Sequence, residues 1–234
     1  MKKLGLIGGV GPESTIPYYR GIIYGVQKKL NKPFFPPLVI ESLSSFEVIR
    51  MSSQKDREGL TKYLLKGIQN LAAAGAEVGA LACNTGHIVF NELQKQSPIP
   101  LVSIVETACA EAKRQGLKKI GLLGTAATME GNYFKIPFEE AGIEIKIPEQ
   151  AERDYIADHI LNELELGIVK EETASHFVEI VEEMSKIQNI DAVILGCTEL
   201  PLIFEGRNLS IPSLDTMQLH ICLLYTSPSP RDRG

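Results

Sequence analysis

The sequence predicts an α/β protein made of two similar halves, each a Rossmann-like domain with a mostly parallel sheet flanked by helices. Short apolar segments alternate with helical segments along the whole chain. The segment Lys2–Gly8 reappears, with conservative changes, at Lys118–Gly124, 116 residues further along. Two apolar runs end in cysteines, Cys83 and Cys197, which are 114 residues apart. These nearly equal offsets indicate a duplicated unit, and we expect the active site in the cleft between the halves.

The individual elements follow from hydrophobic periodicity and from the Gly and Pro residues that interrupt it. A glycine-rich turn follows the first strand, and Pro12 marks the start of the first helix. A polar loop is expected through Arg50 and Ser53. The expected strands cover residues 2–7, 38–42, a run ending at 83, 101–104, 119–124, 143–147, 191–196 and a last one after 211. The expected helices cover about 12–30, a helix ending near 74, 87–95, 105–114, 129–141, 151–166 and 170–187.

The predicted domain boundaries place residues 1–100 and 211–222 in the first α/β domain and residues 101–210 in the second. Residues 223–234 have no amphipathic period and contain two prolines. This tail resembles a translated vector scar, so we predict that it is non-native and assign no role to Cys222.

Composition excludes several classes of function. The chain has 234 residues, and its net charge of -5 with a pI near 5.5 gives no basic surface for nucleic acid. Its apolar runs have the length of strands, and the N-terminus lacks a signal-peptide pattern, so we expect a cytoplasmic protein without membrane contact. Four cysteines are too few for a disulfide scaffold, and Cys109, inside a helical pattern, reads as an inert buried thiol.

The two strand-end cysteines are the strongest functional signal. Free cysteines are most often small buried apolar residues, and that is the alternative interpretation here. However, Asn84 and Thr85 follow the first cysteine, and Thr198 and Glu199 follow the second. Such polar groups have no use in a core. Each sulfur is also expected near backbone N–H groups at a strand-to-helix junction, which would favour the thiolate.

A matched pair of thiols suits the removal of a proton from carbon and its redelivery from the opposite face. A Cα–H is a very weak acid, so the base must be desolvated and the carbanion's charge must be held by fixed donors. With one cysteine as thiolate and the other as thiol, either enantiomer can be the substrate. Each turnover then exchanges the two protonation states.

Other polar patterns have two interpretations each. The turn Gly9–Ser14 resembles a dinucleotide fingerprint but lacks the third glycine, so it is either a site for a small anion or a plain tight turn. Thr125 and Thr128 occupy the related turn of the second half and are either ligand-binding or helix caps. Arg50 and Lys170 are candidates for binding a substrate carboxylate, or are simply solvated.

A metal site is the competing use of Cys83 and His87, whose four-residue spacing could place both on one helical face. Structural zinc requires four ligands, and few others are available in this sequence. We therefore predict no metal, and we expect His87 to form hydrogen bonds to a nearby loop.

Taken together, Cys83–Thr85, Gly196–Glu199, the opening Gly8–Thr15 and Leu123–Thr125 resemble the aspartate/glutamate racemase family, over Met1 to about His220. The resemblance implies an enzyme that needs neither pyridoxal phosphate nor metal, with Cys83 and Cys197 as the acid/base pair. It also implies that Asn84, Thr85, Thr198 and the Val10 backbone hold the amino and carboxylate groups, and that Arg50 or Ser52 and Lys170 bind the side-chain carboxylate. The complete set of expected substrate-binding residues is Val10, Arg50, Ser52, Asn84, Thr85, Thr125, Lys170, Thr198 and Glu199.

The leading hypothesis is an isomerase that interconverts L- and D-aspartate, with glutamate as a possible second substrate. The expected partners are a small acidic amino acid and a second copy of the chain in a homodimer. Two alternatives stay open at this point. One is a related isomerase or racemase acting on maleate or a hydantoin, and the other is a non-catalytic carboxylate-binding protein.

Overall fold

The computed structural model describes residues 1–226, which divide into two compact units. The first unit contains Met1–Ile104 and the chain from Met217 onward, and the second contains Val105–Thr216. Residues 227–234 of the predicted tail lie outside the described residues. Within the described part, no helix is both long and apolar enough to span a membrane.

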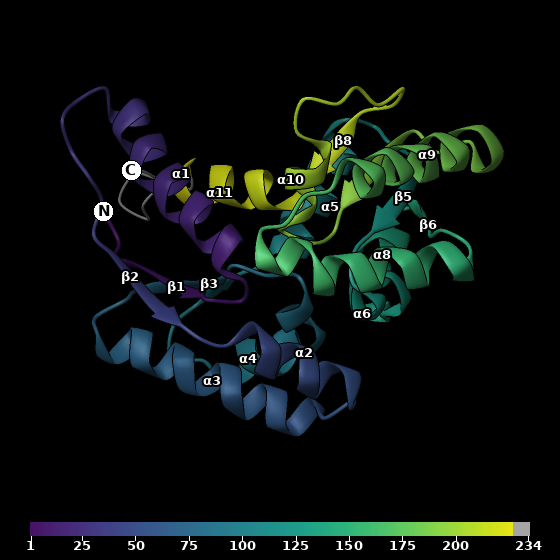
Figure 1. Ribbon diagram of the computed structural model, residues 1–234. Helices are drawn as coiled ribbons and strands as arrows, with labels where there is room; N and C mark the ends of the chain where they lie inside the picture. The colour runs from purple at the N-terminus through teal and green to yellow at the C-terminus, as the bar shows by residue number, and fades with distance from the viewer. Residues whose placement is uncertain (227–234) are drawn as a thin grey trace. The chain divides into compact units, whose positions relative to one another are not determined.

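The first unit is built on a four-stranded parallel sheet with the strand order β2-β1-β3-β4 (Figure 1). Alternate residues of β1 point to opposite faces. Leu4 and Leu6 pack with Tyr18 of α1 and Ile221 of α11, whereas Ile7 belongs to the cluster formed with α3. The strands are β1 (Leu4–Gly8), β2 (Leu38–Ser42), β3 (Val78–Leu81) and β4 (Leu101–Val102). The helical segments are α1 (Pro12–Leu30), α2 (Ser45–Ser53), α3 (Arg57–Ala73), η1 (Thr85–Val89), α4 (Phe90–Gln96) and α11 (Thr216–Thr226).

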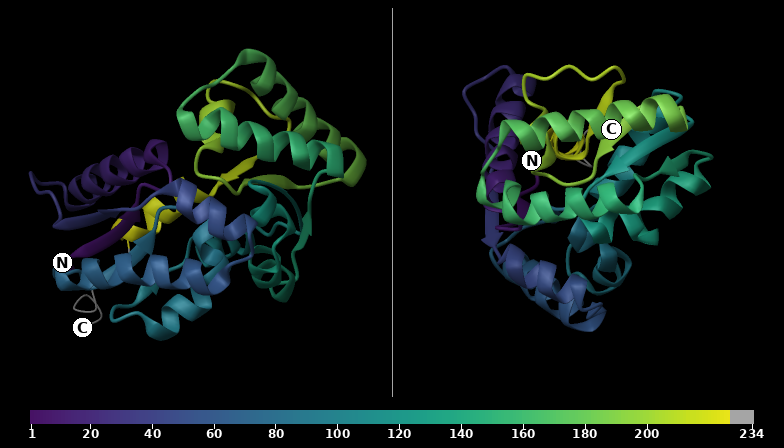
Figure 2. Two further views of the ribbon diagram at one scale, coloured as in Figure 1. Left: turned by 60° about the horizontal axis from the view of Figure 1, so that its bottom comes forward. Right: turned by 45° about the vertical axis from the view of Figure 1, so that its right-hand side comes forward.

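The second unit repeats this plan, with a four-stranded parallel sheet in the order β6-β5-β7-β8. Counted within each unit, the strand order is the same, which confirms the predicted pair of similar α/β halves. The helices α8 and α9 lie side by side and contribute Ile156 and Phe177 to one core cluster (Figure 2). The strands are β5 (Lys119–Leu123), β6 (Glu144–Lys146), β7 (Ala192–Leu195) and β8 (Ser213–Asp215). The helical segments are α5 (Ile104–Arg114), α6 (Ala126–Glu130), α7 (Asn132–Glu140), α8 (Gln150–Asn162), η2 (Leu164–Leu166), α9 (Glu171–Gln188) and α10 (Leu200–Phe204).

The helices differ from the prediction in several places. The polar loop through Arg50 and Ser53 is helix α2, which buries Val48 and Met51 on one face. The single helix predicted over 129–141 is two helices, α6 and α7, separated at Gly131. Helix α10 was not predicted at all.

The chain also divides differently from the prediction near its C-terminus. Residues 211–222 were assigned to the first domain, but β8 pairs in parallel with β7 and so belongs to the second sheet. Helix α11 continues to Thr226, beyond the point where the non-native tail was predicted to begin. Tyr225 packs against Gly25 of α1, and the Lys29 ammonium donates a 2.7 Å hydrogen bond to the Thr226 carbonyl. Residues 223–226 are therefore part of the first unit's packing.

Candidate active site

Each cysteine lies two residues beyond the third strand of its unit. Cys83 follows β3, which ends at Leu81, and Cys197 follows β7, which ends at Leu195. In each sheet this strand pairs with the first strand of the unit. Because parallel strands carry ligand sites beyond their carboxyl ends, each cysteine stands at the edge of its own sheet where such a site is expected.

The turn that carries Cys83 is fixed from the side of α1. The Ser14 hydroxyl, fully buried, donates to the Gly11 carbonyl at 2.9 Å and lies 3.4 Å from the Ala82 carbonyl. Cys83 itself is 5 % exposed. A β-carbon added at Gly86 would lie 3.1 Å from the Cys83 sulfur, so the sulfur packs closely beside the Gly86 backbone.

The His87 ring is hydrogen-bonded to backbone groups at both nitrogens. Its Nδ1 lies 3.0 Å from the Cys83 carbonyl oxygen, and its Nε2 lies 3.2 Å from the Ile104 amide nitrogen. Both ring nitrogens are therefore used by backbone groups, as the loop-bonding interpretation predicts. Burial lowers the pKa of His87 to about 4, which keeps the ring neutral near pH 7.

The glycine-rich turn after β1 has the features of a tight turn. Gly9 has a φ of +75°, and a β-carbon there would lie 2.1 Å from the Leu43 carbonyl oxygen. The Gly9 N–H donates to the Thr15 hydroxyl at 2.9 Å, and that hydroxyl donates to the Gly11 carbonyl at 2.8 Å. A donor that an anion site would use is thus occupied by the turn itself. Val10, also in this turn, is 5 % exposed.

Cys197 lies against two carboxylates. Its thiol donates to Glu199 Oε2 at 3.0 Å, and the Thr198 hydroxyl donates to the same oxygen at 3.0 Å. The sulfur and one oxygen each from Glu165 and Glu199 all lie within 4.8 Å of one another. These three groups could offer a thiolate and two carboxylates to a cation, but the sulfur–carboxylate contact in the structure is a hydrogen bond from a protonated thiol.

The expectation that the strand-end position favours the thiolate is wrong for Cys197. Burial raises the pKa of its thiol well above the usual value, and the charges of Glu199 and Glu165 raise it further. Cys197 is 6 % exposed, so water does little to offset these effects. Any nearby backbone dipoles are outweighed, and the resting form is the thiol.

We predict that Glu199→Gln makes Cys197 more reactive toward iodoacetamide. Removal of one neighbouring negative charge lowers the thiol pKa, and the thiolate is the nucleophile, so alkylation near pH 8 is expected to be about tenfold faster. The rate is measured by peptide mapping, with Cys83 as an internal reference. The control Glu183→Gln removes the same charge at an exposed position and is expected to change nothing. Equal alkylation rates of Cys197 in Glu199→Gln and Glu183→Gln would contradict the conclusion that the Glu199 charge raises the pKa of the thiol.

Of the remaining predicted substrate-binding residues, Thr125, Arg50 and Lys170 have hydrogen bonds or ion pairs within their own units. Thr125 caps α6 by accepting the Thr128 N–H at 3.3 Å, as the helix-cap interpretation predicts. Arg50 is half-exposed and pairs with Glu47 at 2.8 Å, and Ser52 lies near the end of the same helix. Lys170 pairs with Glu163 at 2.8 Å. Asn84 is buried, and Thr85 begins η1 directly after it.

Sequence reasoning missed two carboxylates in the second unit. Glu165, in η2, is the second carboxylate beside Cys197. Glu163 is buried and accepts hydrogen bonds from Lys170 and from the Thr173 hydroxyl at 2.9 Å. Burial alone would raise the pKa of Glu163, but these donors lower it below its usual value. A buried, ionised Glu163 therefore anchors the segment that carries Glu165.

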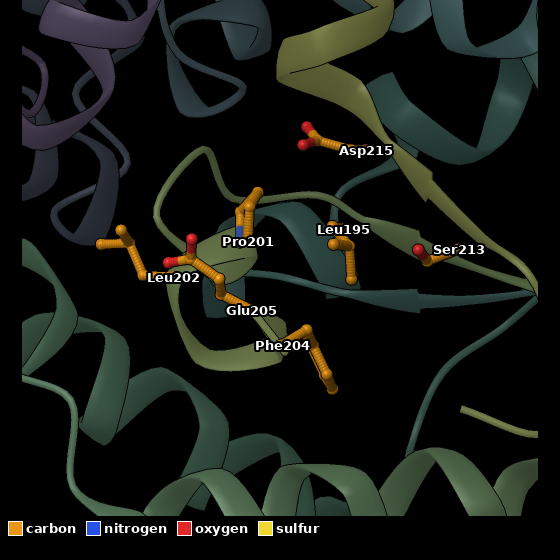
Figure 3. A pocket seen from close by; sticks show the side chains of 7 residues that line it. All are labelled: Leu195, Pro201, Leu202, Phe204, Glu205, Ser213 and Asp215. Carbon is orange, nitrogen blue, oxygen red and sulfur yellow. The ribbon is translucent and has the colours of Figure 1, made fainter. Parts of the chain in front are cut away.

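A pocket of about 370 Å³ opens in the second unit between α10 and the ends of β7 and β8 (Figure 3). Neither cysteine lines it, nor does any predicted substrate-binding residue. Figure 3 shows the side chains that line the pocket. Pro201, Leu202 and Phe204 belong to α10, and Glu205 follows this helix. Leu195, Ser213 and Asp215 belong to the strands.

Comparison with known proteins identifies the family. The family model for Asp/Glu/hydantoin racemases matches residues 7–224. The chain belongs to this family of racemases. It is 26% identical over 220 residues to the "Broad specificity amino-acid racemase RacX" of Bacillus subtilis (strain 168), covering 91% of this chain and 92% of that protein.

Solved structures agree with this assignment to the Asp/Glu/hydantoin racemases. An aspartate racemase homologue from Pyrococcus horikoshii OT3 is 36% identical, with a TM-score of 0.80 and coverage of 96% of this chain and 97% of that chain. A Yersinia pestis protein considered to be an Asp/Glu racemase is 33% identical, with a TM-score of 0.86 and coverage of 96% and 98%. The family resemblance predicted from the cysteine motifs is thereby confirmed.

Proposed function

We propose that this protein interconverts L- and D-aspartate, with glutamate as a second substrate, by proton transfer between Cα and the thiols of Cys83 and Cys197. The observation that carries the proposal is the equivalent placement of the two cysteines, each two residues past the third strand of a repeated sheet. The proposal requires both sulfurs to reach one Cα from opposite faces. No pyridoxal phosphate or metal takes part in it.

The surroundings of Cys197 support a starting role as the proton donor in this proposal. Its raised pKa makes it the proton donor in the resting enzyme, so the first substrate enantiomer to react is the one whose Cα–H faces Cys83. Glu199 accepts a hydrogen bond from the thiol and from Thr198, so it orients the S–H before the proton is delivered. After turnover Cys197 is the thiolate and Cys83 the thiol, and the reverse reaction starts from that form.

The other predicted residues hold the substrate in this proposal. Asn84, Thr85, Thr198 and the Val10 backbone would bind the α-amino and α-carboxylate groups, as the family resemblance implies. Arg50 and Lys170 would bind the side-chain carboxylate. Each already pairs with a protein carboxylate at 2.8 Å, so the substrate would have to share or replace Glu47 or Glu163. Acidic substrates are favoured for this reason, because a second carboxylate is what these cations would recognise.

Solvent deuterium exchange tests the proposal directly. In D₂O with reductant, L-aspartate is expected to yield D-aspartate that carries deuterium at Cα, while recovered L-aspartate stays largely protonated early in the reaction. The reason is that one base removes the original proton and a different base delivers a solvent-derived one. Chiral chromatography with mass spectrometry measures both pools, and the same run is repeated with glutamate, alanine, a hydantoin and maleate.

The panel separates the proposal from its alternatives. Exchange with a hydantoin or isomerisation of maleate, without reaction of any amino acid, would place the activity elsewhere in the family. Binding of aspartate without exchange in a folded, reduced sample would indicate a carboxylate-binding protein. Alanine is included because the Bacillus subtilis relative is named a broad-specificity amino-acid racemase.

A further inference from the structure

The Cys83 turn is tied to the end of β4 by a single buried side chain. A carbonyl can only accept and an amide N–H can only donate, so the His87 ring must donate from Nδ1 to the Cys83 carbonyl and accept at Nε2 from Ile104. Both partners are backbone groups, which fixes the tautomer and the ring position together. His87 therefore spans the distance between the candidate catalytic turn and the strand beside it.

The His87 ring has little freedom to move. It is 4 % exposed and is stacked on Phe90, with ring centroids 4.7 Å apart and an interplanar angle of 8°. Phe90 begins α4, directly after the segment η1 that carries His87. A ring held on its face by an aromatic side chain and at both nitrogens by backbone acts as a rigid spacer.

A second buried histidine holds the other side of the same short segment. The His220 ring, fully buried, has its Nε2 3.2 Å from the Val102 carbonyl and its Nδ1 2.8 Å from the Tyr18 hydroxyl. His220 donates to the carbonyl, so Tyr18 donates to His220. The segment Val102–Ile104 thus has its carbonyl held by one histidine and its N–H held by the other.

This segment is where the chain leaves the first unit, which ends at Ile104. The chain returns at Met217, three residues before His220 in α11. His220 of the returning helix therefore holds the outgoing segment at Val102, and His87 links the same segment at Ile104 to the Cys83 carbonyl.

We propose that His87 is a positioning residue for Cys83, holding the turn that presents the sulfur against a segment that His220 fixes from its other side. The kinetic test of this inference rests on the proposed function. Its chemical test, the alkylation of Cys83, rests on geometry alone. His87 contacts no reacting atom in this proposal, and its effect on the reaction passes through the Cys83 backbone.

Three variants separate the two hydrogen bonds. His87→Phe keeps a ring beside Phe90 and removes both bonds. His87→Asn keeps a donor near the Nδ1 position for the Cys83 carbonyl, and His87→Gln keeps an acceptor near the Nε2 position for Ile104. Phe90→Leu serves as the matched control, because it removes the aromatic stack and leaves both hydrogen bonds in place.

The first readout is the alkylation rate of Cys83, which needs no turnover. Since Cys83 is nearly inaccessible, loosening its turn is expected to speed its alkylation by iodoacetamide at least tenfold in His87→Phe, with the Cys197 rate unchanged. His87→Asn is expected to stay within about threefold of the unmodified chain. Equal acceleration in His87→Phe and Phe90→Leu, compared at conditions of equal unfolding free energy, would overturn the proposal.

The second readout is the primary isotope effect on kcat/KM with α-deuterated L- and D-aspartate. Displacement of Cys83 is expected to lower kcat/KM about 100-fold. The loss is the same for both enantiomers, because the equilibrium constant for their interconversion is one. The isotope effect should rise for the enantiomer whose proton Cys83 removes and fall for the other. Isotope effects that are equal for the two enantiomers would overturn the positioning role of His87. Absence of exchange in the unmodified chain would instead reject the proposed function, and the alkylation rates would then decide the role of His87.

Discussion

Replacement of either Cys83 or Cys197 by alanine is expected to abolish racemisation, with a loss of at least about 10³-fold in kcat/KM. Proton transfer by a positioned acid or base contributes this much on its own, and each variant removes the only group that can serve one face of Cα in the proposed mechanism. The measurement is the rate of D-aspartate formation from L-aspartate, followed by chiral chromatography. Because both thiols lie at strand ends and are small, circular dichroism is expected to show an intact fold in both variants.

The two variants should differ in what they retain. With Cys197→Ala, Cys83 can still remove and return the proton of one enantiomer, so slow deuterium exchange without inversion is expected for that enantiomer. The other enantiomer should exchange in Cys83→Ala. Cys109→Ala is the control, because that thiol is buried in α5 with its sulfur 3.3 Å from the Pro137 carbonyl, and burial raises its pKa. Full racemase activity in a variant lacking Cys83 or Cys197 would remove that residue from the mechanism.

The sequence was sufficient to predict the paired sheets and the two cysteines, because both depend on local pattern. The alternation of strands and helices requires parallel pairing, and the repeated segment at Lys118–Gly124 reveals the duplication. A cysteine followed by small polar residues at the end of an apolar run marks a sheet edge in both halves. The comparisons bear out the family that these motifs suggested.

The Glu165 carboxylate beside Cys197 could not be predicted in the same way, whereas Glu199 was among the predicted residues. Glu165 precedes Cys197 by 32 residues in the sequence and reaches it only because η2 packs near α10. No local spacing encodes that approach. The raised pKa of Cys197 depends on this packing too, which is why the sequence led to the opposite expectation of a thiolate.

The full length of α11 was not predicted, although its sequence held a usable signal. The residues Met217, Ile221, Leu224 and Tyr225 have the spacing of one helical face, and all four pack in the first unit. The composition of residues 223–234, on which the prediction of a non-native tail rests, concealed this helical pattern. Helix α2 was missed for a similar reason, since its serines concealed the buried pair Val48 and Met51.

The stability of the first unit is expected to fall steeply as the pH drops from about 6.5 toward 4. Burial lowers the pKa of His87 to about 4, and burial together with the nearby His87 lowers that of His220 to about 3. An unfolded histidine titrates near 6.5, so between these values the unfolded chain binds protons that the folded chain excludes. The histidine contribution is fully present above pH 6.5 and is lost as the pH falls. Each ring should contribute a slope of up to about 1.4 kcal/mol per pH unit.

Urea unfolding at pH 7.0, 6.0, 5.5, 5.0 and 4.5 measures this slope. His87→Phe and His220→Phe should each reduce the slope by about one proton, whatever they do to the unfolding free energy at pH 7. Tyr18→Phe is the matched control, because it removes the 2.8 Å hydrogen bond to His220 and leaves the imidazole in place, so stability should fall while the slope remains. A slope that is unchanged in both histidine variants would mean that these rings titrate alike in the folded and unfolded chain, which their burial and their fixed backbone partners argue against.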